Sequence, residues 1–225
     1  MVYLRRKVNQ PMRLRWKIAQ LAEAAWWQRY LKNKPKAEYL AWKRKYWLEM
    51  LQKLGLYLAA DARVLDAGCG PAGVFIALPT QHVTAADPLL EAYEEKLTHF
   101  RRDDYPAVRF WKTPLEDLPI EAFDWVFCLN VINHVANIEG GTDKLVACLA
   151  PEGKLVISVD AHNYGVLKHI FRWFQNDILH PHQFDLAEYQ AMLTSRGLQI
   201  EQTVLFKRER IFNYYVMVAS RTALT

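Results

Sequence analysis

A glycine-rich turn between two apolar runs is the segment best suited to hold a ligand. The stretch 63–77 reads RVLDAGCGPAGVFIA, in which Gly68, Gly70 and Gly73 satisfy the pattern GxGxxG. We expect a strand, a glycine turn and the start of a helix. In that arrangement glycines let the backbone approach a ligand, and the N-terminus of the helix offers free N–H groups.

Two acids near this turn narrow the kind of ligand. Asp87 ends the next apolar run, about twenty residues beyond the turn, where a carboxylate can accept hydrogen bonds from both hydroxyls of a ribose. Nicotinamide enzymes share that feature. Asp66, however, lies two residues before the first glycine, where its charge would repel a pyrophosphate but could order the turn and face an α-ammonium group. The pair favours a nucleoside that carries an amino acid over a dinucleotide.

The composition is that of a globular protein without a disulfide or zinc framework. Of the 225 residues, 52% are hydrophobic and 24% charged, so we expect one domain with an elaboration. Cys69, Cys128 and Cys148 lack CxxC or zinc-ligand spacing, and we interpret them as buried thiols. The N-terminus lacks the apolar segment of a signal peptide, and no stretch has the roughly 18 apolar residues of a membrane span. We therefore expect a cytoplasmic protein.

The first 60 residues form a distinct basic and aromatic segment. They contain 14 Lys and Arg against three acids, a net charge of +11, whereas the remainder has 15 bases and 21 acids, a net of −6. The pattern predicts helices over roughly 12–32 and 36–54, interrupted near Pro35. Gly55 can close the second helix.

The second helix is expected to be amphipathic. Tyr39, Trp42 and Tyr46 follow helical spacing, so they should form the inward-facing stripe, while the basic residues 43–45 largely face water. Residues 1–60 are thus predicted to form a basic aromatic helical lid or cap.

Short apolar strands alternate with helices after residue 61. Strands are predicted over 63–67, 82–87, 107–112, 123–130 and 153–160, and helices over 88–100, 142–150 and 185–197. The last two β-prone runs, LQIEQTVLF and RIFNYYVMVAS, are too close for a crossover helix and should form a hairpin. We therefore predict an α/β fold with a seven-stranded, mostly parallel, doubly wound sheet whose last strand is antiparallel, plus the N-terminal helical lid.

The motifs together resemble the class I methyltransferases that depend on S-adenosylmethionine (SAM). VLDAGCGPAG, AADP, PLEDLP before FDWVFCLNVINHV, and LAPEGKLVISVD follow one another in the order and spacing of that family, over roughly residues 61–220. The resemblance implies a SAM-binding methyltransferase domain over 61–225, with a Rossmann-like sheet and SAM as the cofactor.

The same resemblance implies where SAM binds. The glycine loop would lie against its methionine part, Asp87 would bind the ribose, and the segment 115–117 would flank the adenine. The implied cofactor-binding residues are Asp66, Gly68, Cys69, Gly70, Gly73, Asp87, Pro88, Leu115, Glu116, Asn130 and Val131. The chain departs from the family at Pro114, which replaces a polar residue, so no side-chain hydrogen bond is expected from there to the adenine amino group.

Methyl transfer is an in-line displacement from a sulfonium, so the protein mainly positions the acceptor and excludes water. For an O–H or N–H acceptor it can also supply a base, and histidine is the natural base near neutral pH. We predict His134, His162 and His180 as candidates. In the competing interpretations, Asn130 caps a turn, His134 lies on an exposed helix and the HPH segment forms a structural corner. We expect no metal site, although His180 with His182 has an acceptable ligand spacing.

Three roles are open for the N-terminal helices: a lid over SAM, an RNA-binding surface, or an interfacial helix on an anionic membrane. Burial of Trp26, Trp27, Trp42 and Trp47 would weaken the last two.

The predicted function is a SAM-dependent methyltransferase acting on a small-molecule acceptor through an O, N, S or C nucleophile. The alternatives are an RNA acceptor or a membrane-associated quinone or lipid acceptor, an aminopropyltransferase-like enzyme, and a non-catalytic protein with the SAM-binding fold.

Overall fold

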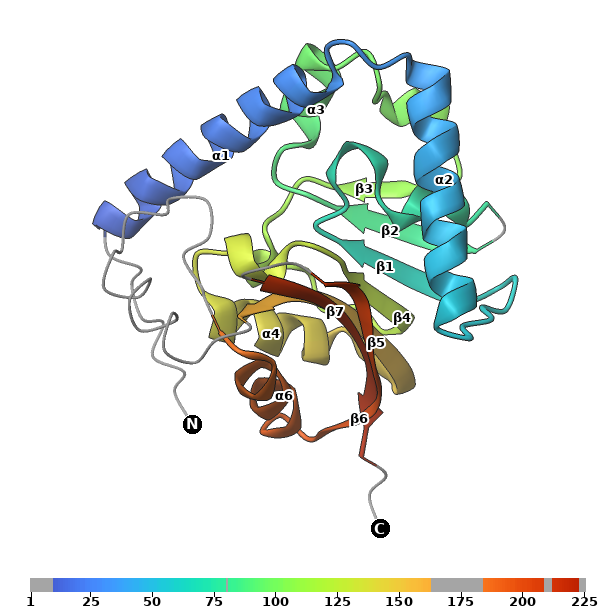
Figure 1. Cartoon of the computed structure of the whole chain (residues 1–225), viewed down its shortest axis with the longest axis vertical. Helices are drawn as coiled ribbons and strands as arrows, with labels where there is room; N and C mark the ends of the chain where they lie inside the picture. The colour runs from blue at the N-terminus through green and yellow to red at the C-terminus, as the bar shows by residue number, and fades with distance from the viewer. Residues whose placement is uncertain (1–9, 80, 163–183, 209–211, 223–225) are drawn as a thin grey trace.

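A seven-stranded sheet runs through the centre of the molecule and has helices on both faces (Figure 1). The computed structural model describes residues 10–79, 81–162, 184–208 and 212–222. The strands are β1 (Arg63–Ala67), β2 (His82–Ala86), β3 (Arg109–Trp111), β4 (Phe123–Cys128), β5 (Leu149–His162), β6 (Leu198–Arg208) and β7 (Phe212–Arg221). The helices are α1 (Gln10–Leu31), α2 (Lys36–Lys53), α3 (Leu90–Lys96), α4 (Ile138–Ala147) and α6 (Leu186–Thr194).

The strand order is β3-β2-β1-β4-β5-β7-β6. Neighbouring strands from β3 to β5 pair in parallel, whereas β7 pairs antiparallel with both β5 and β6. Too few residues separate β6 from β7 for a crossover, so the two strands form a hairpin. The predicted fold class, with its antiparallel last strand, is confirmed.

The central strands are mostly apolar because both sheet faces are covered. On β1, Val64 packs into a cluster with residues of α2 and α3, and Leu65 packs into a second cluster with residues of α4 and α6. Successive side chains of a strand point to opposite faces. The continuous apolar run in the sequence thus reflects burial on both sides.

The glycine turn after β1 differs from the prediction. We expected a helix to start there, but the chain instead makes two short 3-10 turns, Gly70–Ala72 and Val74–Ala77, separated by an extended Gly73. Helix α2 packs on this segment: Trp47 Nε1 donates to the Ala72 carbonyl at 3.0 Å, and Arg44 Nε donates to the Ile76 carbonyl at 2.9 Å. Side chains of α2 therefore satisfy carbonyl groups that a longer helix would have paired internally.

The two N-terminal helices lie close to their predicted ranges, and Gly55 ends the second. Its φ is +64°, which favours glycine. The N–H of Gly55 donates to the Gln52 carbonyl at 3.0 Å, and the N–H of Leu56 donates to the Leu51 carbonyl at 2.9 Å. These two bonds form the Schellman arrangement that satisfies the last carbonyls of a helix.

The inward face of α2 is rotated from the predicted one. Tyr39, Trp47 and Met50 are buried, but Trp42 is 52% exposed. Lys43, which we expected to face water, is half-buried on the inner face. The predictions for Trp42 and Lys43 are therefore wrong, because the stripe with the largest contact to the sheet runs one position further along the helix than the aromatic spacing suggested.

Helix α2 belongs to the same hydrophobic core as the sheet. Leu51 and Leu54 share a buried cluster with Val64 of β1 and Val156 of β5. The division of the chain at residue 60 stays a prediction. The contacts nevertheless show that α2 packs directly on one face of the sheet.

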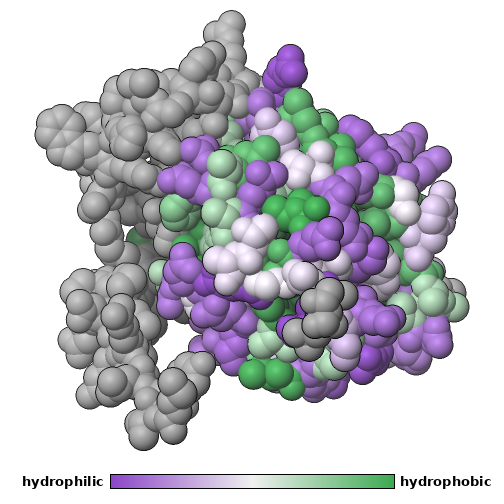
Figure 2. All heavy atoms as spheres, turned by 90° about the horizontal axis from the view of Figure 1, so that it is seen from below, coloured by the Kyte–Doolittle hydropathy of each residue, from purple (hydrophilic) through white to green (hydrophobic). Residues whose placement is uncertain are grey.

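The surface of the described residues is mixed. None of the described helices is long and apolar enough to cross a membrane. Seen from below, hydrophilic residues are interspersed with small hydrophobic patches (Figure 2). The exposed aromatic residues include Trp26, at 50%, and Trp42.

We expect Trp47→Ala to destabilise the fold by about 3 to 5 kcal/mol, because it removes a large buried ring and the hydrogen bond to Ala72. The control is Trp42→Ala on the same helix, whose exposed ring should cost less than about 1 kcal/mol. Urea unfolding measures both. Equal losses for the two variants would show that α2 is not anchored through Trp47.

Candidate functional site

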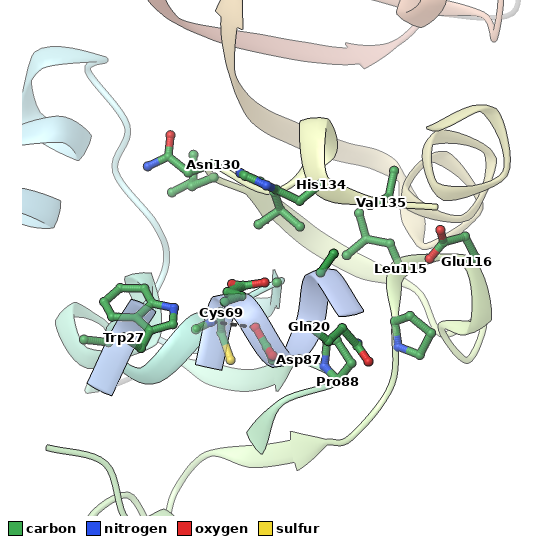
Figure 3. A pocket seen from close by; sticks show the side chains of 18 of the residues that line it. Gln20, Trp27, Cys69, Asp87, Pro88, Leu115, Glu116, Asn130, His134 and Val135 are labelled. Atoms are coloured by element: carbon green, nitrogen blue, oxygen red, sulfur yellow. Dashed lines mark hydrogen bonds between the residues drawn. The ribbon is translucent and has the colours of Figure 1, made fainter. Parts of the chain in front are cut away.

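A cavity opens at the carboxyl ends of β1, β2 and β4 and is closed on its other side by α1 and α2 (Figure 3). Its empty volume is about 980 Å³ with its open mouth included, which is in the size range of small-molecule sites. The predicted residues that line it are Gly68, Cys69, Gly70, Asp87, Pro88, Leu115, Glu116, Asn130, Val131 and His134.

The glycine loop is held tightly against the end of β2. The N–H groups of Gly68 and Cys69 both donate to the Ala86 carbonyl, at 2.7 and 3.0 Å. Gly68 has φ +74°, and a Cβ there would lie 2.3 Å from a methyl carbon of Val131. Gly70 has φ +56°. Only glycine fits at position 68, because any Cβ there would collide with Val131, which lines the cavity beside the loop.

Asp66 and Gly73 do not line the cavity. Asp66 is 2% exposed and accepts a hydrogen bond from the Phe75 N–H at 3.0 Å. A Cβ at Gly73 would lie 2.3 Å from Asp66 Oδ2, so the glycine makes room for the carboxylate. Asp66 therefore orders the turn from the side away from the cavity. It does not face the cavity, where the predicted contact with the ligand would have placed it.

Asp87 sits at the end of β2, where its carboxylate accepts two backbone N–H groups. Gly70 donates to Oδ2 at 2.9 Å and Leu89 donates to Oδ1 at 2.8 Å. Burial, and after it the charge of Glu23, raises the pKa of Asp87 to about 7, against the effect of these N–H donors. Each oxygen keeps a further lone pair, so the group can still accept hydroxyl donors from a ligand.

The N-terminal helices contribute cavity residues that sequence reasoning did not single out. Helix α1 contributes three residues at helical spacing to the cavity wall, Gln20, Glu23 and Trp27. Helix α2 contributes Lys43. Burial raises the pKa of Glu23, while polar groups of Trp27 and Tyr93 oppose that shift. The i, i+3, i+7 spacing of the three α1 residues is visible in the sequence. The basic residues of α1 also recur at helical spacing, so the spacing alone does not tell which face of the helix meets the cavity.

Lys43 brings a positive charge to the cavity. Its Nζ lies 4.3 Å from the centre of the Trp47 ring and 5.0 Å from that of Tyr46, which are cation–π distances. Burial lowers its pKa to about 8, although the charge of Asp66 opposes the shift. The group could pair with a carboxylate of a ligand.

Of the predicted bases, the structure places His134 at the cavity. It ends a 3-10 turn, Ile132–His134, rather than lying on an exposed helix, and its N–H donates to the Val131 carbonyl at 2.8 Å. His162 is the last residue of β5, but its side chain falls outside the described part of the chain. His180 also lies outside the described residues.

Asn130 occupies the turn between β4 and His134. It has φ +60°, the left-handed region that asparagine tolerates better than most residues. Its N–H donates to Ser158 Oγ at 2.8 Å, and the Ser158 hydroxyl donates to Asn130 Oδ1 at 3.4 Å. The following turn has no side-chain cap, so Asn130 does not cap it.

A family model described as a methyltransferase domain matches residues 39–203. The ubiquinone biosynthesis O-methyltransferase of Rickettsia canadensis is 28% identical over 150 residues, which are 62% of this chain and 63% of that protein. The chain therefore matches less than two thirds of the length of this relative.

Two solved methyltransferases share the fold. The 1,6-didemethyltoxoflavin-N1-methyltransferase of Burkholderia thailandensis, solved with bound 1,6-didemethyltoxoflavin and S-adenosylhomocysteine, has a TM-score of 0.65 with 18% identity over 99% of this chain and 94% of that one. A phosphoethanolamine N-methyltransferase of Haemonchus contortus, solved with SAM, has a TM-score of 0.64 with 16% identity over 80% of this chain and 53% of that one.

Asp66 should make stability pH-dependent in an unusual direction. Burial, helped by the charge of Asp87 and opposed by the Phe75 N–H, raises its pKa to about 7. Between about pH 4 and 7 the folded state therefore holds a proton that the unfolded state has lost. Its contribution to stability is greatest below pH 4 and falls as the pH rises to 7.

We expect Asp66→Asn to lose less stability than the wild type between pH 4 and 7, as measured by urea unfolding at each pH. The control is Asp124→Asn on the surface, where Arg63 lowers the pKa of the carboxylate. That contribution is present above the unfolded-state pKa and is lost only as the pH falls below it. A wild type and an Asp66→Asn variant with parallel pH profiles would contradict the expected proton uptake.

Proposed function

The chain belongs to the methyltransferase domain family, and we propose that it transfers the methyl group of SAM to a small-molecule acceptor. The observation that carries the proposal is the glycine loop at Gly68 and Gly70, whose backbone is clamped beside the buried carboxylate of Asp87. SAM supplies an electrophilic methyl group on a sulfonium. The residues of the cavity would bind SAM, orient the acceptor and exclude water.

The polar groups around the cavity match the polar parts of SAM. Asp87 offers acceptors for the ribose hydroxyls, and Lys43 offers a cation for the carboxylate of the methionine part. Glycine at position 68 lets the side chain of Val131 pack directly on the loop backbone at the edge of the cavity. Leu115, which is buried, provides an apolar wall for a ring.

The chain would accelerate transfer mainly by holding the acceptor in line with the methyl group in a site covered by α1 and α2. Burial raises the pKa of the Cys69 thiol well above its usual value. The thiol therefore stays protonated beside the cofactor and does not compete for the methyl group. His134 is the described cavity histidine and is the proposed base for an O–H or N–H acceptor.

A hydroxylated quinone precursor is the second candidate for the acceptor. It is supported by the likeness to the ubiquinone biosynthesis O-methyltransferase of Rickettsia canadensis. In this version the exposed rings of Trp26 and Trp42, on helices rich in Lys and Arg, would dock on an anionic membrane that holds the acceptor. Trp27 and Trp47 instead face inward, so the tryptophans support both a lid and an outer docking surface. An RNA acceptor has no comparable support.

We expect the wild type to bind SAM and not NAD in calorimetric titration. Asp87→Asn should weaken SAM binding by about 1.5 to 3 kcal/mol, roughly 10- to 150-fold, since it removes a charged acceptor for the ribose. Asp103→Asn, on an exposed turn, is the control and should bind as the wild type does. Tight binding of NAD without binding of SAM would contradict the proposal.

His134→Ala should lower turnover by about 10² to 10⁴ while SAM affinity stays near that of the wild type, because the imidazole acts on the acceptor. The test is a screen of methyl transfer to phenolic, quinol and carboxylate compounds, followed by a pH profile. His82→Ala, at an exposed position on β2, is the control. If His134→Ala keeps turnover within a few-fold at every pH, His134 is not the base.

A further inference from the structure

We propose that the side-chain amide of Gln20, on α1, binds the adenine ring of the cofactor. This role rests on the SAM site proposed above. It assigns a recognition function to the N-terminal helix, which would contribute a hydrogen bond to the cofactor as well as cover it.

The first observation is an unpaired donor. Gln20 Nε2 is buried in the wall of the cavity, and within the described ranges of the chain no acceptor lies within hydrogen-bond distance of it. Leaving a buried N–H group unpaired is costly, and folded proteins rarely do so. A ligand that brings an acceptor to this point would remove that cost.

The second observation is where Gln20 lies. Figure 3 shows it beside Pro88, at the end of the cavity that Leu115 and Glu116 also line. Pro114, which lines the same cavity, has no polar side-chain atom. The Glu116 carboxylate accepts the N–H of Asn137 at 2.9 Å. The strands and loops of the sheet thus offer few free polar groups here, and α1 supplies one.

The chemistry of a carboxamide matches adenine. The amide holds a donor and an acceptor side by side in one plane, and an adenine edge presents an amino donor next to a ring-nitrogen acceptor. The two groups can form paired hydrogen bonds. On the edge that carries N6 and N7 in adenine, hypoxanthine presents two acceptors, O6 and N7, so the amide oxygen of Gln20 would face an acceptor in either orientation of the amide.

Trp27, two turns along α1 from Gln20, packs the helix against the rest of the molecule. Trp27 packs edge-on against Tyr93 of α3, with ring centres 6.4 Å apart. The same indole lies 3.7 Å from where a Cβ of Gly70 would be. The helix that carries Gln20 is therefore seated against the glycine loop within two turns of this residue.

The experiment compares two nucleosides on the full chain. Wild type, Gln20→Ala and Gln28→Ala are titrated with S-adenosylhomocysteine and with S-inosylhomocysteine, its hypoxanthine counterpart. Gln28 lies on α1 but is exposed, so it is the matched control. We expect Gln20→Ala to bind S-adenosylhomocysteine about 10-fold or more weakly and to lose most of the wild-type preference for it over S-inosylhomocysteine, with Gln28→Ala unchanged.

Thermal unfolding without ligand separates this role from a structural one. Because Gln20→Ala removes an unpaired buried donor, its ligand-free midpoint should equal or exceed that of the wild type. A midpoint several degrees lower would overturn the proposal, since Gln20 would then be needed by the fold itself.

The other outcomes are equally decisive. Unchanged affinity in Gln20→Ala, or an equal loss for both nucleosides, would overturn the reading of adenine while leaving the SAM site intact. A wild type that binds neither nucleoside would overturn the proposed function, and this role with it.

Discussion

Two buried carboxylates at the ends of neighbouring strands are the constraint around which the site is built. Asp66 is the penultimate residue of β1 and Asp87 directly follows β2, and both are almost completely shielded from water. Such groups are tolerated only when donors surround them. Here the donors are backbone N–H groups of Gly70, Phe75 and Leu89. Satisfying the carboxylates therefore determines the path of the glycine turn.

The path of that turn in turn explains why α2 is part of the core. Because the turn breaks into two 3-10 segments, some of its carbonyls point away from any partner within the turn. Trp47 and Arg44 of α2 donate to two of them. The N-terminal segment is thus joined to the wall of the cavity by hydrogen bonds as well as by apolar contact. Substitutions in α2 that remove these hydrogen bonds should therefore alter the segment that follows the glycine loop.

The cavity has two kinds of wall. The wall formed by the sheet and its loops combines the backbone of the glycine loop and apolar side chains with the polar side chains of Asp87, Glu116, Asn130 and His134. The wall formed by α1 and α2 adds the polar side chains of Gln20, Glu23 and Lys43. Polar groups from both walls therefore face the cavity, and the shared buried core ties α2 to the sheet.

The sequence by itself was sufficient to predict the strands, their mostly parallel order, the antiparallel hairpin and the positions of Gly68, Gly70 and Asp87 at one edge. These follow from apolar runs, glycines and chain length between strands, which are local properties. It did not reveal the 3-10 turns after Gly70, because their carbonyl partners come from α2, far away in the chain. Nor did it reveal which face of each helix meets the cavity. Trp42 and Lys43 are adjacent and both fit an amphipathic pattern, and only packing against the sheet turns one outward and the other inward. The rotation of a helix about its own axis is set by the surface it covers, so only the tertiary structure decided that Lys43 and Gln20 line the cavity.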